Sequence, residues 1–115
     1  MKVYCASYSD YVHEEITYNA NEVFKSMADA IESGKNWIKA MIEECKLCPS
    51  PYIDEETLRE IVEDGRLEIN HYDDSADLTY ADKDDDSEPY FFVDIIELPL
   101  RTERINYTSF DPSKL

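Results

Sequence analysis

Two cysteines in the C-x-x-C spacing, Cys45 and Cys48, are the first residues whose types and spacing could do chemistry. A zinc site needs four ligands. Only Cys5, His13 and His71 remain to complete one, and none of them forms a second close pair. A redox pair places its reactive thiol at a helix N-terminus, where the dipole lowers the thiol pKa, whereas Cys45 is predicted near a helix C-terminus. The sequence therefore favours a packed Cys45 and a Cys48 in a loop over a zinc or redox site.

A second candidate is a run of alternating acids in the pattern D-x-D-x-D-x-E, formed by Asp82, Asp84, Asp86 and Glu88. An EF-hand calcium loop needs Gly at its sixth position and Glu at its twelfth. Counted from Asp82, these positions hold Ser87 and Val93. The run is therefore predicted to be a solvated turn between strands, with weak calcium binding of another type as the alternative.

The sequence offers little for catalysis. The two histidines, His13 and His71, lie in no catalytic motif, and there is no Gly-rich phosphate loop or H-E-x-x-H motif. His71 falls on the apolar face of a predicted strand and is expected to be a core residue. Gly34 and Gly65 are the only glycines, so a cradle of backbone amides for phosphate is not expected. We therefore expect a non-enzymatic protein with no catalytic residue, metal or cofactor.

Charge is the strongest feature of the chain. Its 115 residues include 27 acidic and 11 basic ones, a formal net charge of −16. Residues 51–100 hold 17 acidic and three basic residues, a net charge of −14, whereas residues 1–50 contribute −3 and residues 101–115 contribute +1. Because phosphate contacts need Lys and Arg, this balance argues against direct binding to nucleic acid or to an anionic membrane. The expected partner is a basic protein.

The acidic block predicts a partner-binding surface. Carboxylates at positions i and i+2 of a strand lie about 6.5–7 Å apart, which is close to the spacing of phosphates along a DNA strand. Such a surface would block the Arg- and Lys-lined cleft of a nucleic-acid-binding enzyme, with exposed tyrosines as anchors. The predicted contact residues are Glu55, Glu56, Glu60, Glu63, Asp64, Glu68, Asp73, Asp74, Asp77, Asp82, Asp84, Asp85, Asp86 and Glu88.

Three other interpretations remain open. The acids would serve solubility alone if they bind nothing. An acidic interaction or accessory module without nucleic-acid mimicry would contact its partner through apolar and aromatic surface. A small metal-binding protein would use Cys45 and Cys48 or the acids of residues 82–88.

Periodicity predicts the elements that carry these residues. Residues 2–9 are rich in β-formers and apolar on both faces, which indicates a central strand. A helix is predicted after its N-cap Ser26, with Gly34 on the packing face allowing close approach to a sheet. A second, short helix is expected between its N-cap Asp54 and Gly65. The apolar stripe of the first helix is Met27, Ala30, Ile31, Gly34, Trp37, Ile38, Met41, Ile42 and Cys45.

The second half of the chain completes the sheet. Residues 67–72 and 76–80 alternate around a turn and predict a β-hairpin. Residues 90–98 are apolar on both faces except at two acids, so they are expected to form the best-buried strand. The order is roughly ββααβββ: an α+β fold with a mostly antiparallel sheet of four to five strands and two helices on one face. A single domain is expected over residues 1–115, with residues 101–115 as a C-terminal tail.

In length, acidity and α+β pattern the chain resembles the small acidic proteins of phages and mobile elements that inhibit host defence nucleases, including anti-CRISPR and anti-restriction proteins. Residues 3–11, VYCASYSDY, are similar to the first strand of ArdA-type anti-restriction proteins. The Gly- and Trp-containing segment expected next in that family is absent from residues 12–18, and no functional residue is carried over. The resemblance implies a DNA-mimicking inhibitor in the cytoplasm of a bacterial host.

No apolar run approaches the roughly 20 residues of a membrane-spanning helix.

Overall fold

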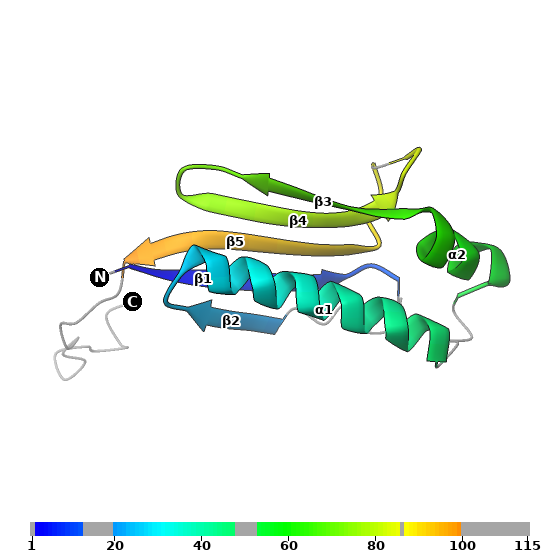
Figure 1. The fold of residues 1–115 in the computed structure, drawn as a ribbon, viewed down its shortest axis with the longest axis horizontal. Coiled ribbons are helices and arrows are strands. Elements are labelled where there is room, and N and C mark those ends of the chain that lie inside the picture. The colour runs from blue at the N-terminus through cyan, green and yellow to red at the C-terminus, as the bar shows by residue number, and fades with distance from the viewer. Residues whose placement is uncertain (1, 13–19, 48–52, 86, 100–115) are drawn as a thin grey trace, which may run out of the picture.

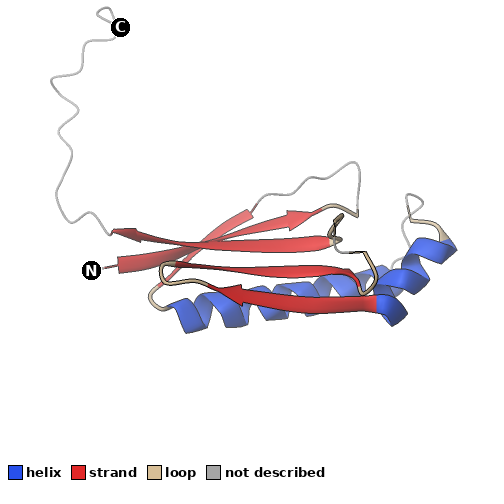
Figure 2. Cartoon of the chain, turned by 90° about the horizontal axis from the view of Figure 1, so that it is seen from above, coloured by secondary structure: helices blue, strands red, loops and turns tan. Residues whose placement is uncertain are grey.

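The described part of the chain folds into one antiparallel sheet of five strands with its helices on one face (Figure 1, Figure 2). The computed structural model describes residues 2–12, 20–47, 53–85 and 87–99. The strands lie in the order β2-β1-β5-β4-β3, and every neighbouring pair is antiparallel. This confirms the α+β fold. The elements are β1 (Lys2–Asp10), β2 (Ala20–Phe24), α1 (Met27–Leu47), α2 (Glu55–Arg59), η1 (Glu60–Asp64), β3 (Gly65–His71), β4 (Ser75–Asp82) and β5 (Phe91–Pro99).

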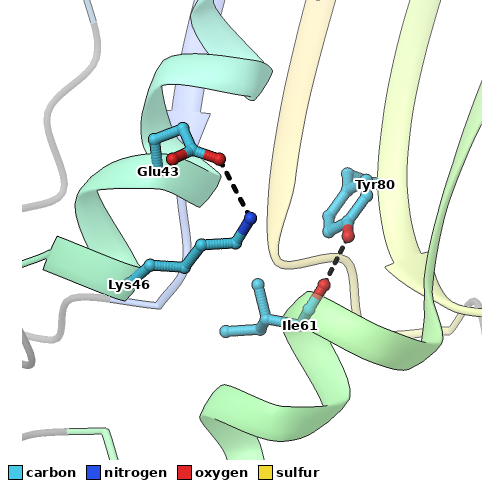
Figure 3. A network of polar contacts seen from close by, with 4 residues as sticks. All are labelled: Glu43, Lys46, Ile61 and Tyr80. Carbon is cyan, nitrogen blue, oxygen red and sulfur yellow. Dashed lines mark hydrogen bonds and ion pairs between the residues drawn. The ribbon is translucent and has the colours of Figure 1, made fainter.

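The order of elements differs from the prediction in the second helix, which has two parts. Asp54 caps α2 as expected, because its carboxylate accepts a hydrogen bond of 2.7 Å from the Thr57 amide. After Arg59 the helix widens into the π-helical turn η1. The Tyr80 hydroxyl, which comes from β4, donates to the carbonyl of Ile61 within this turn (Figure 3). A bond from the sheet therefore joins the widened turn to β4.

Gly65 follows η1 for a reason that the sequence pattern did not indicate. Glycine is common just past a helix C-terminus because it readily adopts a left-handed conformation, but Gly65 has φ −71° and ψ 144°, an extended conformation open to any residue. A Cβ at Gly65 would overlap the ring and hydroxyl of Tyr80. Glycine is needed here for space, because the Tyr80 side chain crosses this position to reach Ile61.

Helix α1 packs across the middle of the sheet along its predicted stripe. Ser26 caps it by accepting a hydrogen bond of 3.1 Å from the Asp29 amide. Gly34 and Ile38 are buried in this stripe. A Cβ at Gly34 would lie only 3.2 Å from Leu78 Cδ2 and 3.3 Å from Val93 Cγ1. The predicted close approach of helix and sheet at Gly34 is confirmed.

Gly34→Ala is expected to leave the free energy of unfolding almost unchanged. Alanine gains about 1 kcal/mol of helix propensity over glycine, but its methyl group would crowd Leu78 and Val93 at distances tighter than ordinary contact. Urea denaturation of the two proteins measures the balance. A full gain of about 1 kcal/mol would contradict close packing at this position.

The core between α1 and the sheet is aromatic at its centre. Trp37 packs against Tyr8 and Phe91, with ring centroids 5.2 Å and 6.0 Å away. The Tyr8 hydroxyl pairs with the Ser33 hydroxyl at 2.8 Å, so its polar end is satisfied. Tyr8 and Phe91 therefore form part of the core.

The prediction that residues 90–98 form the best-buried strand is wrong. Strand β5 is central and buries one face, but on the other face Ile96 and Leu98 are 43% and 40% exposed. Strand β4 buries more of its length. Within the described part of the chain, all helices lie on one side of the sheet, and no element covers the opposite side, which we call the open face (Figure 2). Apolar residues on both sides of a strand do not ensure that both sides are covered.

Candidate protein-binding surface

The predicted contact residues fall into three groups rather than one continuous surface. The first, which we call the acidic end, comprises Glu55, Glu56, Glu60, Glu63, Asp64, Asp82, Asp84, Asp85 and Glu88. Glu68 and Asp77 lie on the open face, where Glu68 adjoins the acidic end by lining one hollow with Asp82 and Asp84. Asp73 and Asp74 lie in the turn between β3 and β4. Asp86 lies outside the described residues.

The acidic end forms because two segments far apart in sequence meet at one end of the sheet (Figure 1). The first is α2 with η1, and the second is the connection between β4 and β5. The amide of Lys83 donates to the carbonyl of Asp64 at 2.9 Å. The Tyr90 hydroxyl donates to Glu60 Oε2 at 3.3 Å. These bonds place the carboxylates of both segments side by side.

Basic residues offset only part of this charge. Among the described residues of these two segments and the start of β3, three bases accompany the nine acids: Arg59, Arg66 and Lys83. Lys83 forms an ion pair with Asp64 at 3.3 Å, and Arg66 donates to the carbonyl of Gly65. The acidic end therefore carries a net charge of about −6 at neutral pH, where carboxylates are ionised.

Several of these carboxylates also shape the turn that carries them. Asp82 Oδ1 accepts the amide of Asp84 at 2.8 Å. Asp85 Oδ1 accepts the hydroxyl and the amide of Ser87 at 2.6 and 3.1 Å, and these bonds lower the pKa of Asp85. The described residues of this run, 82–85 and 87–88, thus have the geometry of a hydrogen-bonded turn. The described residues contain no group of three or more side chains arranged to hold a metal ion.

The open face holds an acidic pair at its centre. Asp77 of β4 lies directly opposite Asp94 of β5 in the strand register, and Asn70 donates to Asp77 at 2.9 Å. Asp94 was not among the predicted contact residues. It interrupts an otherwise apolar strand, and this signal in the sequence could have identified it as a candidate contact residue. Glu68 of β3 lies on the same face, so this side of the sheet combines acids with exposed apolar residues.

Asp94→Asn is expected to stabilise the fold by about 0.2–1 kcal/mol, because like charges directly opposite on paired strands repel each other. The midpoint of urea denaturation at low salt measures this gain. The gain should vanish in an Asp77→Asn background, where the repulsion is already absent. An equal gain in both backgrounds would contradict the proposed repulsion.

The turn acids lie far from the acidic end. The β3–β4 hairpin runs from Gly65, paired with Asp82, to His71, paired with Ala76. At about 3.3 Å per residue, these ends are about 20 Å apart. Asp73 and Asp74 therefore form a separate exposed patch, next to the 55% exposed Tyr72.

The described cysteine and histidine residues show no sign of a reactive site. Cys45 is buried, and burial, followed by the charges of Asp10 and Glu44, raises its thiol pKa to about 11. It therefore stays protonated at neutral pH, as a packed cysteine would. His71 is exposed at the end of β3, so its expected place in the core is wrong. Cys48 and His13 lie outside the described residues.

Comparison of the chain with models of protein families, with curated proteins and with solved structures gives no match. Among the described residues, no helix is both long and apolar enough to cross a membrane. The acidic end and the open face are therefore the features of the molecule that bear on its function.

Proposed function

We propose that this protein is a non-enzymatic inhibitor that occupies the basic, nucleic-acid-binding cleft of another protein, such as a CRISPR nuclease, and presents carboxylates in place of phosphates. The observation that carries the proposal is the acidic end, where α2, η1 and the β4–β5 connection bring nine carboxylates together. They face three bases of these segments and of β3, and the neighbouring Lys46 of α1. The class resemblance to phage anti-defence proteins points the same way.

The density of negative charge favours an inhibitor over a protein whose acidic residues serve solubility alone. Solubility of a small domain needs a net charge of magnitude about 2–8, whereas this chain carries −16. Charge that serves only solubility has no reason to collect on two segments that meet in space. A concentrated negative surface attracts a basic cleft over a Debye length and speeds association with it.

The test uses purified CRISPR nucleases and restriction endonucleases, each with a fluorescently labelled DNA substrate. We expect the full chain to displace the substrate from at least one of them. Inhibition should weaken as salt rises from about 50 to 200 mM, because binding between opposite charges is screened. Absence of displacement across the panel, or displacement unaffected by salt, would contradict charge mimicry.

A second candidate is an acidic interaction module without nucleic-acid mimicry. The open face favours it, because Val23, Ile96 and Leu98 are between 40% and 64% exposed on the uncovered side of the sheet. In this case Ile96→Ser with Leu98→Ser should abolish partner binding, while neutralising the acidic end should have little effect. The opposite pattern is expected for the inhibitor.

A further inference from the structure

A half-open cavity lies beside the acidic end. Its volume is about 410 Å³, within the range of small-ligand sites. Tyr11 and Val12 follow β1, Ile53 precedes α2, and Pro89 and Tyr90 lead into β5; these residues supply its aromatic and apolar wall. Glu88 is the charged residue among those described that line it, and none of them is Lys or Arg. The cavity therefore combines an apolar wall with a negative charge.

Backbone hydrogen bonds hold the two tyrosines of this wall in place. The Tyr11 amide donates to the Tyr90 carbonyl at 3.0 Å, and the Tyr90 amide donates to the Tyr80 carbonyl at 2.8 Å. The buried Asp10 accepts the Val12 amide at 2.9 Å, which fixes the chain just after β1. Because the backbone that carries the wall is already fixed, little backbone entropy is lost when a ligand binds.

The surroundings of the cavity strengthen its preference for a cation. Glu60 lies 3.3 Å from the Tyr90 hydroxyl. Burial, followed by the charges of Glu60 and Asp82, raises the pKa of Tyr90 to about 12, so the phenol stays neutral beside them. The Tyr11 side chain is 57% exposed and accessible to a ligand.

We propose that this cavity receives an arginine side chain of the basic partner, with the guanidinium against the tyrosines and paired with Glu88. Aromatic rings attract cations and stack on the planar guanidinium, and the carboxylate accepts its paired N–H donors. The apolar wall contacts the aliphatic stem. This inference rests on the proposed function for its partner, because arginine is characteristic of surfaces that bind nucleic acid.

The test does not need the partner. The full chain, labelled with ¹⁵N, is titrated with N-acetyl-arginine methylamide and with the matching citrulline derivative, which has the same shape without the charge. We expect saturable shifts at Tyr11, Glu88 and Tyr90 with arginine and at least fivefold weaker binding of citrulline. Equal binding of the two probes, or no saturable shift at the cavity, would overturn the inference.

Matched variants test this site, which shares Glu88 with the acidic end. Tyr11→Ala and Glu88→Gln should each weaken arginine binding about fivefold, whereas Tyr11→Phe should keep it and Glu22→Gln, on distant β2, should leave it unchanged. Tyr11 and Glu88 are exposed, so these variants are expected to fold. A full chain that binds arginine but displaces no nuclease substrate would count against the proposed function alone. Inhibition without arginine binding would count against the cavity alone.

Discussion

Neutralising three exposed carboxylates of the acidic end in one variant, Glu55→Gln, Glu63→Gln and Asp84→Asn, is expected to weaken inhibition of a basic nuclease about 10- to 100-fold. Each exposed ion pair with the partner contributes about 0.5–1 kcal/mol, and 1.4 kcal/mol corresponds to a factor of ten in affinity. The loss should shrink at high salt, where these interactions are already screened. A titration of inhibitor against nuclease activity at two salt concentrations measures both effects.

The matched control changes the net charge by the same amount elsewhere. Glu22→Gln, Asp29→Asn and Glu32→Gln alter exposed residues of β2 and of the N-terminal half of α1. This variant should inhibit within about threefold of the parent, because distant exposed charges are screened from the interface. Circular dichroism of both variants tests whether they fold like the parent. Equal losses in the two variants would show that net charge alone matters and would contradict a role for the acidic end.

Gly65→Ala is expected to lower the free energy of unfolding by about 1–3 kcal/mol, as overpacking in a filled site does. A methyl group at this position would overlap the Tyr80 ring, which is itself held by its hydrogen bond to the Ile61 carbonyl. The expected loss is a substantial part of the 5–15 kcal/mol of a typical domain. Urea denaturation monitored by Trp37 fluorescence measures it.

A double-mutant cycle identifies the cause of this loss. In a Tyr80→Ala background, which is itself destabilised, Gly65→Ala should cost much less, because the ring that the methyl group meets is gone. If Gly65→Ala lowers the free energy of unfolding equally in both backgrounds, the loss arises from backbone entropy or from β3 rather than from overlap with the Tyr80 ring. The outcome also bears on function. The hydrogen bond from Tyr80 to Ile61 joins β4 to η1, and both elements carry residues of the acidic end.

The local elements of this fold could be read from the sequence where short-range chemistry defines them. Ser26 and Asp54 cap their helices as expected, because a side-chain oxygen satisfies amides that the first helical turn leaves free. The hairpin was also predictable, because its residues alternate around a polar turn. The π-helical turn was not, since it depends on Tyr80, which is 19 residues away from Ile61.

The candidate site was predictable in composition but not in shape. The sequence located the acids between residues 54 and 88, yet it gave no means of separating the turn acids from the acidic end. It also left out Asp94, whose position opposite Asp77 follows only from the pairing of β4 with β5. The exposed His71 shows the same limit: it pairs with the buried Ala76 but lies at the end of the edge strand β3, and a strand pattern does not predict how far along a face the cover extends.

By itself, the sequence determined that this protein is acidic over one segment, that its helices lie between two strands and three further strands, and where its helices begin. These properties depend on residue type and short-range spacing, and they need no knowledge of distant contacts. Only the tertiary structure decided that α2 and η1 meet the β4–β5 connection, that one face of the sheet is open, and that a tyrosine-walled cavity lies beside the acids. These three features depend on antiparallel strand pairing and on burial under α1, because both bring together residues that are far apart in the chain.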